Sequence, residues 1–330
     1  MLYDCFMFYN ELEVLQLRLK ELDDLADRFV LVESTRTLRN EPKKLFFKSN
    51  TALFEKYNHK IINVIVDDMP NSSNAWDLEA HLRNAMMRGL SDCGEEDVIM
   101  ISDIDEIPRK SSVRTLVPQL GNEFVSLHMP QYYYYLNCQL PVDWVGTVVS
   151  NYGALKLTTP QSLRSNKERF KGIANAGWHF SYLGDIDMIV DKLSTFSHTE
   201  YDTPVYKDRK HIEQCLKDGK DLFRRGLDGV FVEIDASYPE TVISDRAFFS
   251  RFIHPPDPQE VRLAKLQAGI LALSQNMRVE IEGLNRIIEA RDEGIAFLKS
   301  ELDRANSELE SIKSSRPYRL YARLSRVLRR

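Results

Sequence analysis

The sequence has no segment suited to crossing a membrane or to directing secretion. Its N-terminus, MLYDCFMFYNELE, carries acidic residues where a signal peptide needs basic ones. No run approaches the ~20 apolar residues that span a bilayer. We therefore exclude a membrane-spanning protein and expect a cytoplasmic one.

Cysteine is scarce and the excess of one charge is small. Cys5, Cys93, Cys138 and Cys215 include no C-x-x-C pair of the kind found in zinc and redox sites. Forty-four basic against 49 acidic side chains leave a net charge of −5, which argues against nucleic acid as a partner. The 330 residues are 43% hydrophobic and 28% charged, which is typical of a globular chain with one catalytic-sized domain and an appendage.

Short apolar runs alternate with helical stripes through the first hundred residues. The runs that favour strands are residues 3–9, 28–33, 60–66 and 97–102. Between them, residues 11–21 and 74–90 place apolar side chains at helical spacing. The alternation predicts an α/β fold with a doubly wound sheet, whose ligands lie at the carboxyl ends of the strands. Aromatic and β-branched runs over residues 124–149 predict antiparallel strands beyond it.

Two acidic residues, Asp103 and Asp105, follow the fourth predicted strand directly. If the segment stays extended, alternate side chains share a face, so both carboxylates point the same way. Paired carboxylates repel unless a cation compensates, and hard oxygen ligands suit Mg²⁺ or Mn²⁺. The alternative is that these acids cap the turn and the helix after Pro108. The position at a strand's carboxyl end favours metal binding.

Several blocks of the sequence resemble glycosyltransferase family 17. They are YDCFMFYNEL (3–12), DRFVLVESTRT (27–37), Arg83-Asn84, DIDEIP (103–108) and GWHFS (177–181). The resemblance covers roughly residues 2–250, and the blocks together are more specific than a lone D-x-D. It implies a GT-A type fold and an inverting transferase that uses a nucleotide-sugar. The family includes the enzyme that adds the bisecting N-acetylglucosamine to N-glycans.

The resemblance also implies roles for single residues. Asp103 and Asp105 would hold a Mn²⁺ or Mg²⁺ diphosphate. His179 would complete the metal shell or contact the diphosphate. The residues expected at the nucleotide-sugar are Tyr9, Asn10, Glu11, Glu33 and Arg83. Trp178 is expected there too, as a stacking surface for a sugar together with Trp144, although such aromatic residues are more often part of a core. Inversion needs a carboxylate that takes the acceptor proton. The sequence leaves four choices open, Glu106, Asp143, Asp185 and Asp187, and the first choices are Glu106 and Asp185 because each adjoins a block of the site.

Plain structural roles compete with several of these assignments. Glu11 is also a favourable acid for a helix N-terminus, and Arg83 could belong to an ion pair within its helix. A lone histidine such as His179 is usually structural. Weaker candidates, expected on a following loop, are Lys192, Ser197 and His198.

The C-terminal part has a different pattern. An apolar seam runs from Leu263 to Ile312 in heptads with one stutter, and Arg291 is its clear violation. It predicts a coiled coil over residues 257–313, after a transferase domain over residues 1–256, and hence a homo-oligomer whose strand number stays open. Residues 314–330 carry six arginines and no acid. They form either a basic amphipathic tail that contacts anionic lipid or a disordered basic tail.

We therefore expect an inverting glycosyltransferase that moves N-acetylglucosamine from a UDP-sugar to a glycan or a lipid-linked saccharide. Without a signal anchor, a bacterial enzyme at the inner face of the membrane fits better than a Golgi enzyme. The alternative is a coiled-coil scaffold or glycan-binding protein with an inactive transferase-like domain. A nucleotidyltransferase is disfavoured because no glycine-rich phosphate loop with a lysine follows the first strand.

Overall fold

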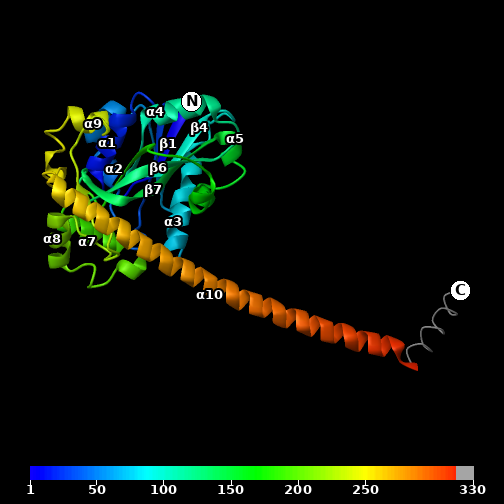
Figure 1. Cartoon of the computed structure of the whole chain (residues 1–330). Coiled ribbons are helices and arrows are strands. Elements are labelled where there is room, and N and C mark those ends of the chain that lie inside the picture. The colour runs from blue at the N-terminus through cyan, green and yellow to red at the C-terminus, as the bar shows by residue number, and fades with distance from the viewer. Residues whose placement is uncertain (317–330) are drawn as a thin grey trace. The chain divides into compact units, whose positions relative to one another are not determined.

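The computed structural model describes residues 1–316 and separates the chain into two compact units. The first unit runs from Met1 to Ile270 and contains every strand of the described residues. The second begins at Leu271 and is helical where it is described. Figure 1 traces both from blue to red.

The first four long strands form the parallel half of one sheet. They are β1 (Leu2–Met7), β2 (Arg28–Ser34), β3 (Ile61–Val66) and β4 (Val98–Asp103), in the order β3-β2-β1-β4. Cys5 of β1 pairs with Val30 of β2 on one side and with Ile101 of β4 on the other. The four predicted strands are confirmed, and their carboxyl ends lie at one edge.

Helices cover both faces of this half. They include α1 (Leu12–Leu22), α3 (Ala75–Asn84), α4 (Lys110–Leu116), α6 (Pro160–Asn166) and α9 (Glu240–Ser244). Because strand side chains alternate, Phe6 packs with Leu15 and Leu19 of α1 in one core, whereas Cys5 packs with Leu82 of α3 in another. The expected doubly wound α/β fold of the GT-A type is confirmed.

The second half of the sheet is mixed. Its strands are β5 (Glu106–Pro108), β6 (Val125–Tyr133), β7 (Cys138–Asn151), β8 (Lys171–Ile173), β9 (Gly177–Ser181) and β10 (Val230–Phe231). β7 lies antiparallel to both β4 and β6, as the pattern over residues 124–149 predicts. β9 pairs with β5, and this register sets His179 opposite Glu106. The two segments that carry the predicted site residues are therefore neighbours.

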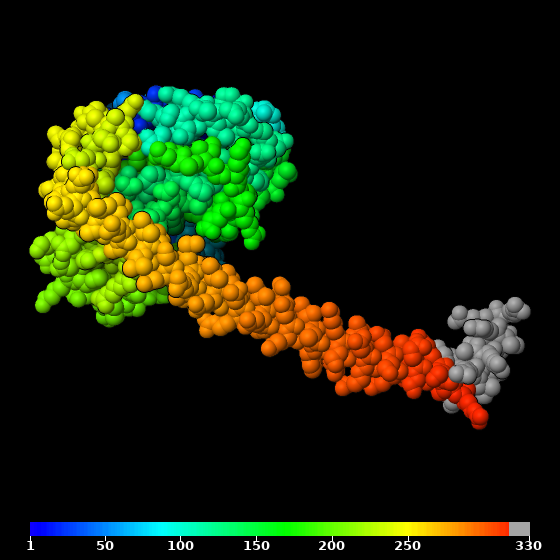
Figure 2. Space-filling model, in the orientation of Figure 1, coloured from blue at the N-terminus to red at the C-terminus, as the bar shows by residue number. Residues whose placement is uncertain are grey.

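The remaining helices are short. They are α2 (Phe46–Ser49), α5 (Tyr152–Leu155), α7 (Ile186–Thr195) and α8 (Arg209–Asp218), with 3₁₀ turns at Thr51–Tyr57, Ala85–Gly89, Val117–Gln119, Lys167–Arg169, Thr199–Tyr201 and Ser250–Phe252. α7 and α8 enclose a third core that includes Leu193 and Ile212. In the space-filling view, later segments hide most of the N-terminal strands on the visible face (Figure 2).

The predicted helix over residues 74–90 is divided. α3 begins after Asn74, whose side chain caps it by accepting from the backbone N–H of Trp76 at 3.1 Å. It ends at Asn84, and a 3₁₀ turn continues to Gly89. Val30 packs so closely here that a Cβ at position 89 would lie 2.5 Å from its Cγ1, which explains why glycine closes this segment.

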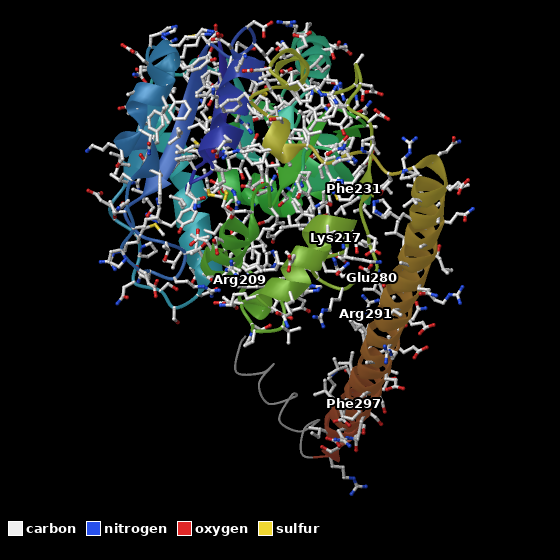
Figure 3. All side chains as sticks on the ribbon, turned by 90° about the vertical axis from the view of Figure 1, so that its left-hand side faces the viewer. Arg209, Lys217, Phe231, Glu280, Arg291 and Phe297 are labelled. Atoms are coloured by element: carbon white, nitrogen blue, oxygen red, sulfur yellow. The ribbon has the colours of Figure 1, made fainter. Side chains whose placement is uncertain are left out.

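A single long helix, α10 (Gln259–Ser314), occupies the predicted coiled-coil region. Its first three turns belong to the first unit, where Gly269 packs against Pro141. Glu280, Arg291 and Phe297 project from the helix surface farther along (Figure 3). Most of the predicted basic tail lies outside the described residues. None of the helices over residues 1–316 combines the length and the apolar character that crossing a bilayer requires.

Candidate functional site

A cavity of about 630 Å³ opens at the carboxyl ends of β1 and β4. It is lined where these strands end, by residues that include Tyr9 after β1 and Asp103, the last residue of β4. Other segments that reach its wall are α3, α6, β9, α7 and the loop after α7. The volume lies within the usual range for sites that bind small molecules and cofactors.

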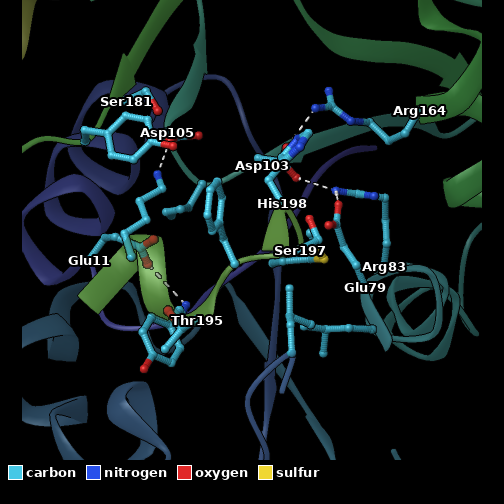
Figure 4. A pocket seen from close by; sticks show the side chains of 18 of the residues that line it. Glu11, Glu79, Arg83, Asp103, Asp105, Arg164, Ser181, Thr195, Ser197 and His198 are labelled. Atoms are coloured by element: carbon cyan, nitrogen blue, oxygen red, sulfur yellow. Dashed lines mark hydrogen bonds and ion pairs between the residues drawn. The ribbon is translucent and has the colours of Figure 1, made fainter. Parts of the chain in front are cut away.

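Asp103, the last residue of β4, lies between two arginines (Figure 4). Its carboxylate pairs with Nη2 of Arg83 at 3.0 Å and with Nη2 of Arg164 at 2.7 Å. Burial alone would raise the pKa of Asp103, but the two guanidiniums outweigh it and hold the pKa well below its usual range. The carboxylate is therefore ionised at any physiological pH.

Asp105 has a separate set of nitrogen partners. Its Oδ2 lies 3.0 Å from Nζ of Lys192, and its Oδ1 lies 3.5 Å from Nε2 of His179. Burial opposes ionisation here too, yet Lys192 and His179 hold the pKa of Asp105 well below its usual range. Lys192 lies in the last turn of α7, although the sequence suggested a loop.

The prediction that residues 103–105 form an extended segment is wrong. β4 ends at Asp103, residues 104–105 form a turn, and β5 begins at Glu106. Both carboxylates nevertheless reach the same cavity, because the turn and not strand alternation directs them.

Arg18 of α1, which the sequence analysis did not single out, holds this turn from below. It is fully buried and forms a bidentate pair with buried Asp4, at 2.7 and 2.6 Å. Its Nη1 donates to the carbonyl oxygens of Asp103, Ile104 and Glu106 at 3.1, 3.2 and 2.6 Å. Three backbone carbonyls of the turn therefore depend on one side chain. The sequence does indicate this buried pair, since Asp4 interrupts an apolar strand and Arg18 lies on the leucine face of its helix.

Glu106, one of the two predicted bases, lies beneath the cavity and not on its wall. It is fully buried, and its oxygens accept from Nε1 of Trp144 at 2.5 Å and from the backbone N–H of Asp103 at 3.1 Å. Both Nη atoms of Arg164 also donate to it, at 2.9 and 2.8 Å. With four donors on two oxygens, Glu106 positions Arg164 and Trp144.

Four other predicted residues also lie off the cavity wall over the described part of the chain. Asp185 is exposed and caps α7 by accepting from the backbone N–H of Met188 at 3.0 Å. Glu33 is buried and accepts from the backbone N–H groups that begin α2, while Asn10 donates to the carboxylate of Asp191. Trp178 packs in the core beneath the guanidinium of Arg109.

His179 does line the cavity, and its ring stacks on the ring of Trp144. The two ring centroids lie 4.7 Å apart, with planes inclined by 26°. Nδ1 of His179 is buried and has no hydrogen-bond partner among the described residues. Nζ of Lys167 lies 3.9 Å above the centroid of the Trp144 ring. Burial, with a smaller contribution from Arg164, lowers the pKa of Lys167 to about 8.

Tyr9 and Glu11 line the cavity where β1 ends. The Glu11 carboxylate accepts from the backbone N–H groups of Tyr9 and Asn10 at 3.2 and 3.0 Å, so it stabilises the turn into α1. Burial, with the nearby Asp191 carboxylate, raises the pKa of Tyr9 to about 12. Nζ of Lys43 lies 5.1 Å from the centroid of the Tyr9 ring and adds a cation to this end.

The cavity wall carries more positive than negative charge. Within the described residues the basic side chains are Arg36, Lys43, Arg83, Arg164, Lys167, Lys192 and Arg225, and the acidic ones are Glu11, Glu79, Asp103 and Asp105. Ser197 and His198, the two predicted candidates that follow α7, also line the cavity. Such a surplus of cations favours an anionic ligand.

Asp103 and Asp105 carry oxygen atoms of the kind that divalent cations prefer, and basic side chains pair with both carboxylates. Over the described range, no three His, Cys, Asp or Glu side chains are arranged to hold an ion. The two ionised carboxylates nevertheless line one cavity, which His179 also lines, and Nδ1 of His179 is buried without a hydrogen-bond partner among the described residues. One or two carboxylates together with phosphate oxygens are a common environment for Mg²⁺.

The sequence matches a family model. The model described as Glycosyltransferase family 17 matches residues 1–228. Curated relatives include β-1,4-mannosyl-glycoprotein 4-β-N-acetylglucosaminyltransferases from Homo sapiens and Rattus norvegicus, each 32% identical over 112 residues. These matches cover 32% of this chain and 21% of each relative, so the chain spans about a fifth of the length of the curated relatives it matches.

Two solved structures share a distant likeness. One is a mannosyltransferase from Pyrobaculum calidifontis in complex with GDP-Man and Mn²⁺, at 12% identity and a TM-score of 0.38, covering 97% of this chain and 82% of that one. The other is a 2-C-methyl-D-erythritol 4-phosphate cytidylyltransferase from Francisella tularensis, at 13% identity and a TM-score of 0.32, covering 53% and 89%.

Proposed function

Because this chain belongs to glycosyltransferase family 17, we propose that it transfers a sugar from a UDP-sugar to a saccharide acceptor. The observation that carries the proposal is the cavity at the ends of β1 and β4, where two ionised carboxylates meet a surplus of cations. The names of the curated relatives favour N-acetylglucosamine as the sugar.

The diphosphate of the donor accounts for the charges of the cavity. Its negative charge would be attracted by Lys167, which has no carboxylate within ion-pair distance among the described residues, and by Lys43. Tyr9 and Arg83 are our proposed nucleotide contacts, since both reach the wall.

Asp103, Asp105 and His179 are the residues that would hold Mn²⁺ or Mg²⁺. A divalent cation there would supply Lewis-acid stabilisation of the departing UDP. The Arg83 and Arg164 guanidiniums, bonded to Asp103, keep its carboxylate ionised and oriented toward the cavity.

We propose inversion in a single displacement, in which the acceptor hydroxyl attacks the anomeric carbon as it loses its proton to a base. For Glu106 to be that base, its bonds to Trp144 and Arg164 would have to open first. Asp185 would have to leave its capping position on α7. The acceptor, a glycan or a lipid-linked saccharide, the membrane contact through residues 314–330 and the location at the inner face of a membrane remain proposals from the sequence.

The test is release of UDP or GDP from a panel of nucleotide-sugars, with Mn²⁺, with Mg²⁺ and with EDTA. We expect metal-dependent release from one UDP-sugar, lost in Asp103→Asn and Asp105→Asn. Asp92→Asn, which changes an exposed aspartate away from the cavity, is the matched control and should keep the activity.

The alternative of an inactive scaffold makes the opposite prediction. If no donor is turned over, and calorimetry detects no binding of UDP with or without Mn²⁺, the transferase proposal fails. Nucleotide release that persists unchanged in both aspartate variants would keep the enzyme but reject this metal site.

A further inference from the structure

The helix α10 carries an apolar stripe that the described residues leave exposed. Ile281, Leu284, Ile288 and Leu298 are 54%, 53%, 47% and 67% exposed, respectively. The stripe repeats at heptad spacing from Ile281 to Ile312, which exceeds the three to four heptads that distinguish a coiled coil from a surface helix. A stripe of this length in water needs a partner.

The register of the heptads indicates what kind of partner fits. With Ile281 at position a, the a residues are Ile281, Ile288, Ile295, Leu302 and Leu309. The d residues are Leu284, Arg291, Leu298, Ala305 and Ile312. Isoleucine at a combined with leucine at d, as in the pairs 281/284 and 295/298, favours two parallel strands, in which a meets a and d meets d. The last pair, Leu309 and Ile312, has the reverse combination, so the preference comes from the first three heptads. In an antiparallel pair, residues at a would pack against residues at d, so isoleucine at a would not pack against isoleucine.

Arg291 supports a dimer over larger bundles. A single charged residue in the seam favours the state that leaves it access to water, and a two-stranded coil exposes its core most. In a parallel pair, Asp292 of the partner copy would occupy the flanking e position, within reach of the guanidinium. A trimer would instead gather three arginines around a closed axis.

The flanking charges are compatible with the same arrangement. In a parallel pair, each g residue faces the e residue five positions later on the partner copy. Glu308 then faces Lys313, an opposite-charge pair. The other facing pairs, 280 with 285, 287 with 292, 294 with 299 and 301 with 306, bring no like charges together.

We propose that residues 281–312 form a parallel, in-register coiled coil with a second copy of this chain. Each a and d residue then packs against its own counterpart, so the stripe is complementary to itself. The inference is independent of the transferase activity, since it concerns α10 alone.

The decisive test is disulfide formation in Ala305→Cys at a d position, under mild oxidation of the full chain. In the parallel register the two introduced thiols face each other within disulfide reach. In an antiparallel pair over residues 281–312, residue 305 would face residue 288, about 25 Å along the axis from its counterpart at 1.5 Å per residue. We expect near-complete cross-linking of Ala305→Cys and little of Ser307→Cys, the control on the outer f position.

The mass in solution completes the test. Light scattering should give twice the 38.3 kDa of one chain. Arg291→Leu should raise the melting temperature of the helix and allow species larger than a dimer, because it removes the charged residue from the seam. A monomer at micromolar concentration, a trimer of the unaltered chain, or equal cross-linking at positions 305 and 307 would overturn the proposal.

Discussion

Replacing Arg18 with methionine should both destabilise the first unit and disable the site. The substitution leaves Asp4 as a buried carboxylate without its partner, and breaking a buried pair in this way costs about 3–5 kcal/mol. Three carbonyls of the Asp103–Glu106 turn also lose a donor, at about 1 kcal/mol or more for each that stays buried without one. The loss approaches the whole stability of a domain, about 5–15 kcal/mol.

A second variant separates stability from positioning. In Asp4→Leu/Arg18→Met the buried charge is removed from both partners, and apolar replacement of a buried pair is often neutral. We expect this double variant to recover about 3 kcal/mol relative to Arg18→Met. Its activity should remain low, because nothing then holds the turn that directs Asp103 and Asp105.

Urea unfolding, extrapolated linearly to water, measures the stability, and UDP release measures the activity. Lys20→Met is the matched control on the same helix, since its exposed pair with Asp245 should be worth less than about 1 kcal/mol. The reasoning is refuted if Arg18→Met costs less than about 1 kcal/mol, or if the double variant shows the kcat of the unaltered chain.

Three further predictions concern single residues. Lys167→Met should raise the KM for the donor about tenfold, or about 1.4 kcal/mol. In the unaltered chain, donor binding should weaken as the pH rises through about 8, because Lys167 loses its proton there. Lys167→Arg should remove this pH dependence. Glu106→Gln should cost about 3 kcal/mol in urea unfolding as well as activity, whereas a residue acting only as base would lose kcat at unchanged stability. Gly177→Ala should cost about 1–3 kcal/mol in the same assay, because its Cβ would lie 2.4 Å from the Ile107 carbonyl oxygen; Gly121→Ala, with open space, should not.

Local sequence patterns were sufficient to predict the parallel strands and the long C-terminal helix of this protein. The strands β1 to β4 follow from short apolar runs and the long helix α10 from a heptad seam, and both patterns depend only on neighbours along the chain. The position of Asp103 after a buried strand was enough to predict a ligand site, because carboxyl ends of parallel strands share an edge.

The local patterns failed where a side chain's role depends on a distant partner. Glu106 was chosen as a base from its neighbours in sequence, but Arg164 and Trp144, 58 and 38 positions away, surround it. Asp185 was also chosen from its neighbours, although its cap on α7 is a local contact with Met188. Arg164 and Lys167, which line the cavity, lie in a stretch with no motif.

The sequence by itself therefore determined the fold class, the edge of the sheet that carries the site and the apolar seam of α10. Only the tertiary structure decided which acids face the cavity and which are enclosed. The physical reason is that the charge of a buried carboxylate depends on cations brought near it from residues about 20 to 90 positions away, as Arg83, Arg164 and Lys192 do for Asp103 and Asp105. No periodic pattern in the sequence indicates those pairings.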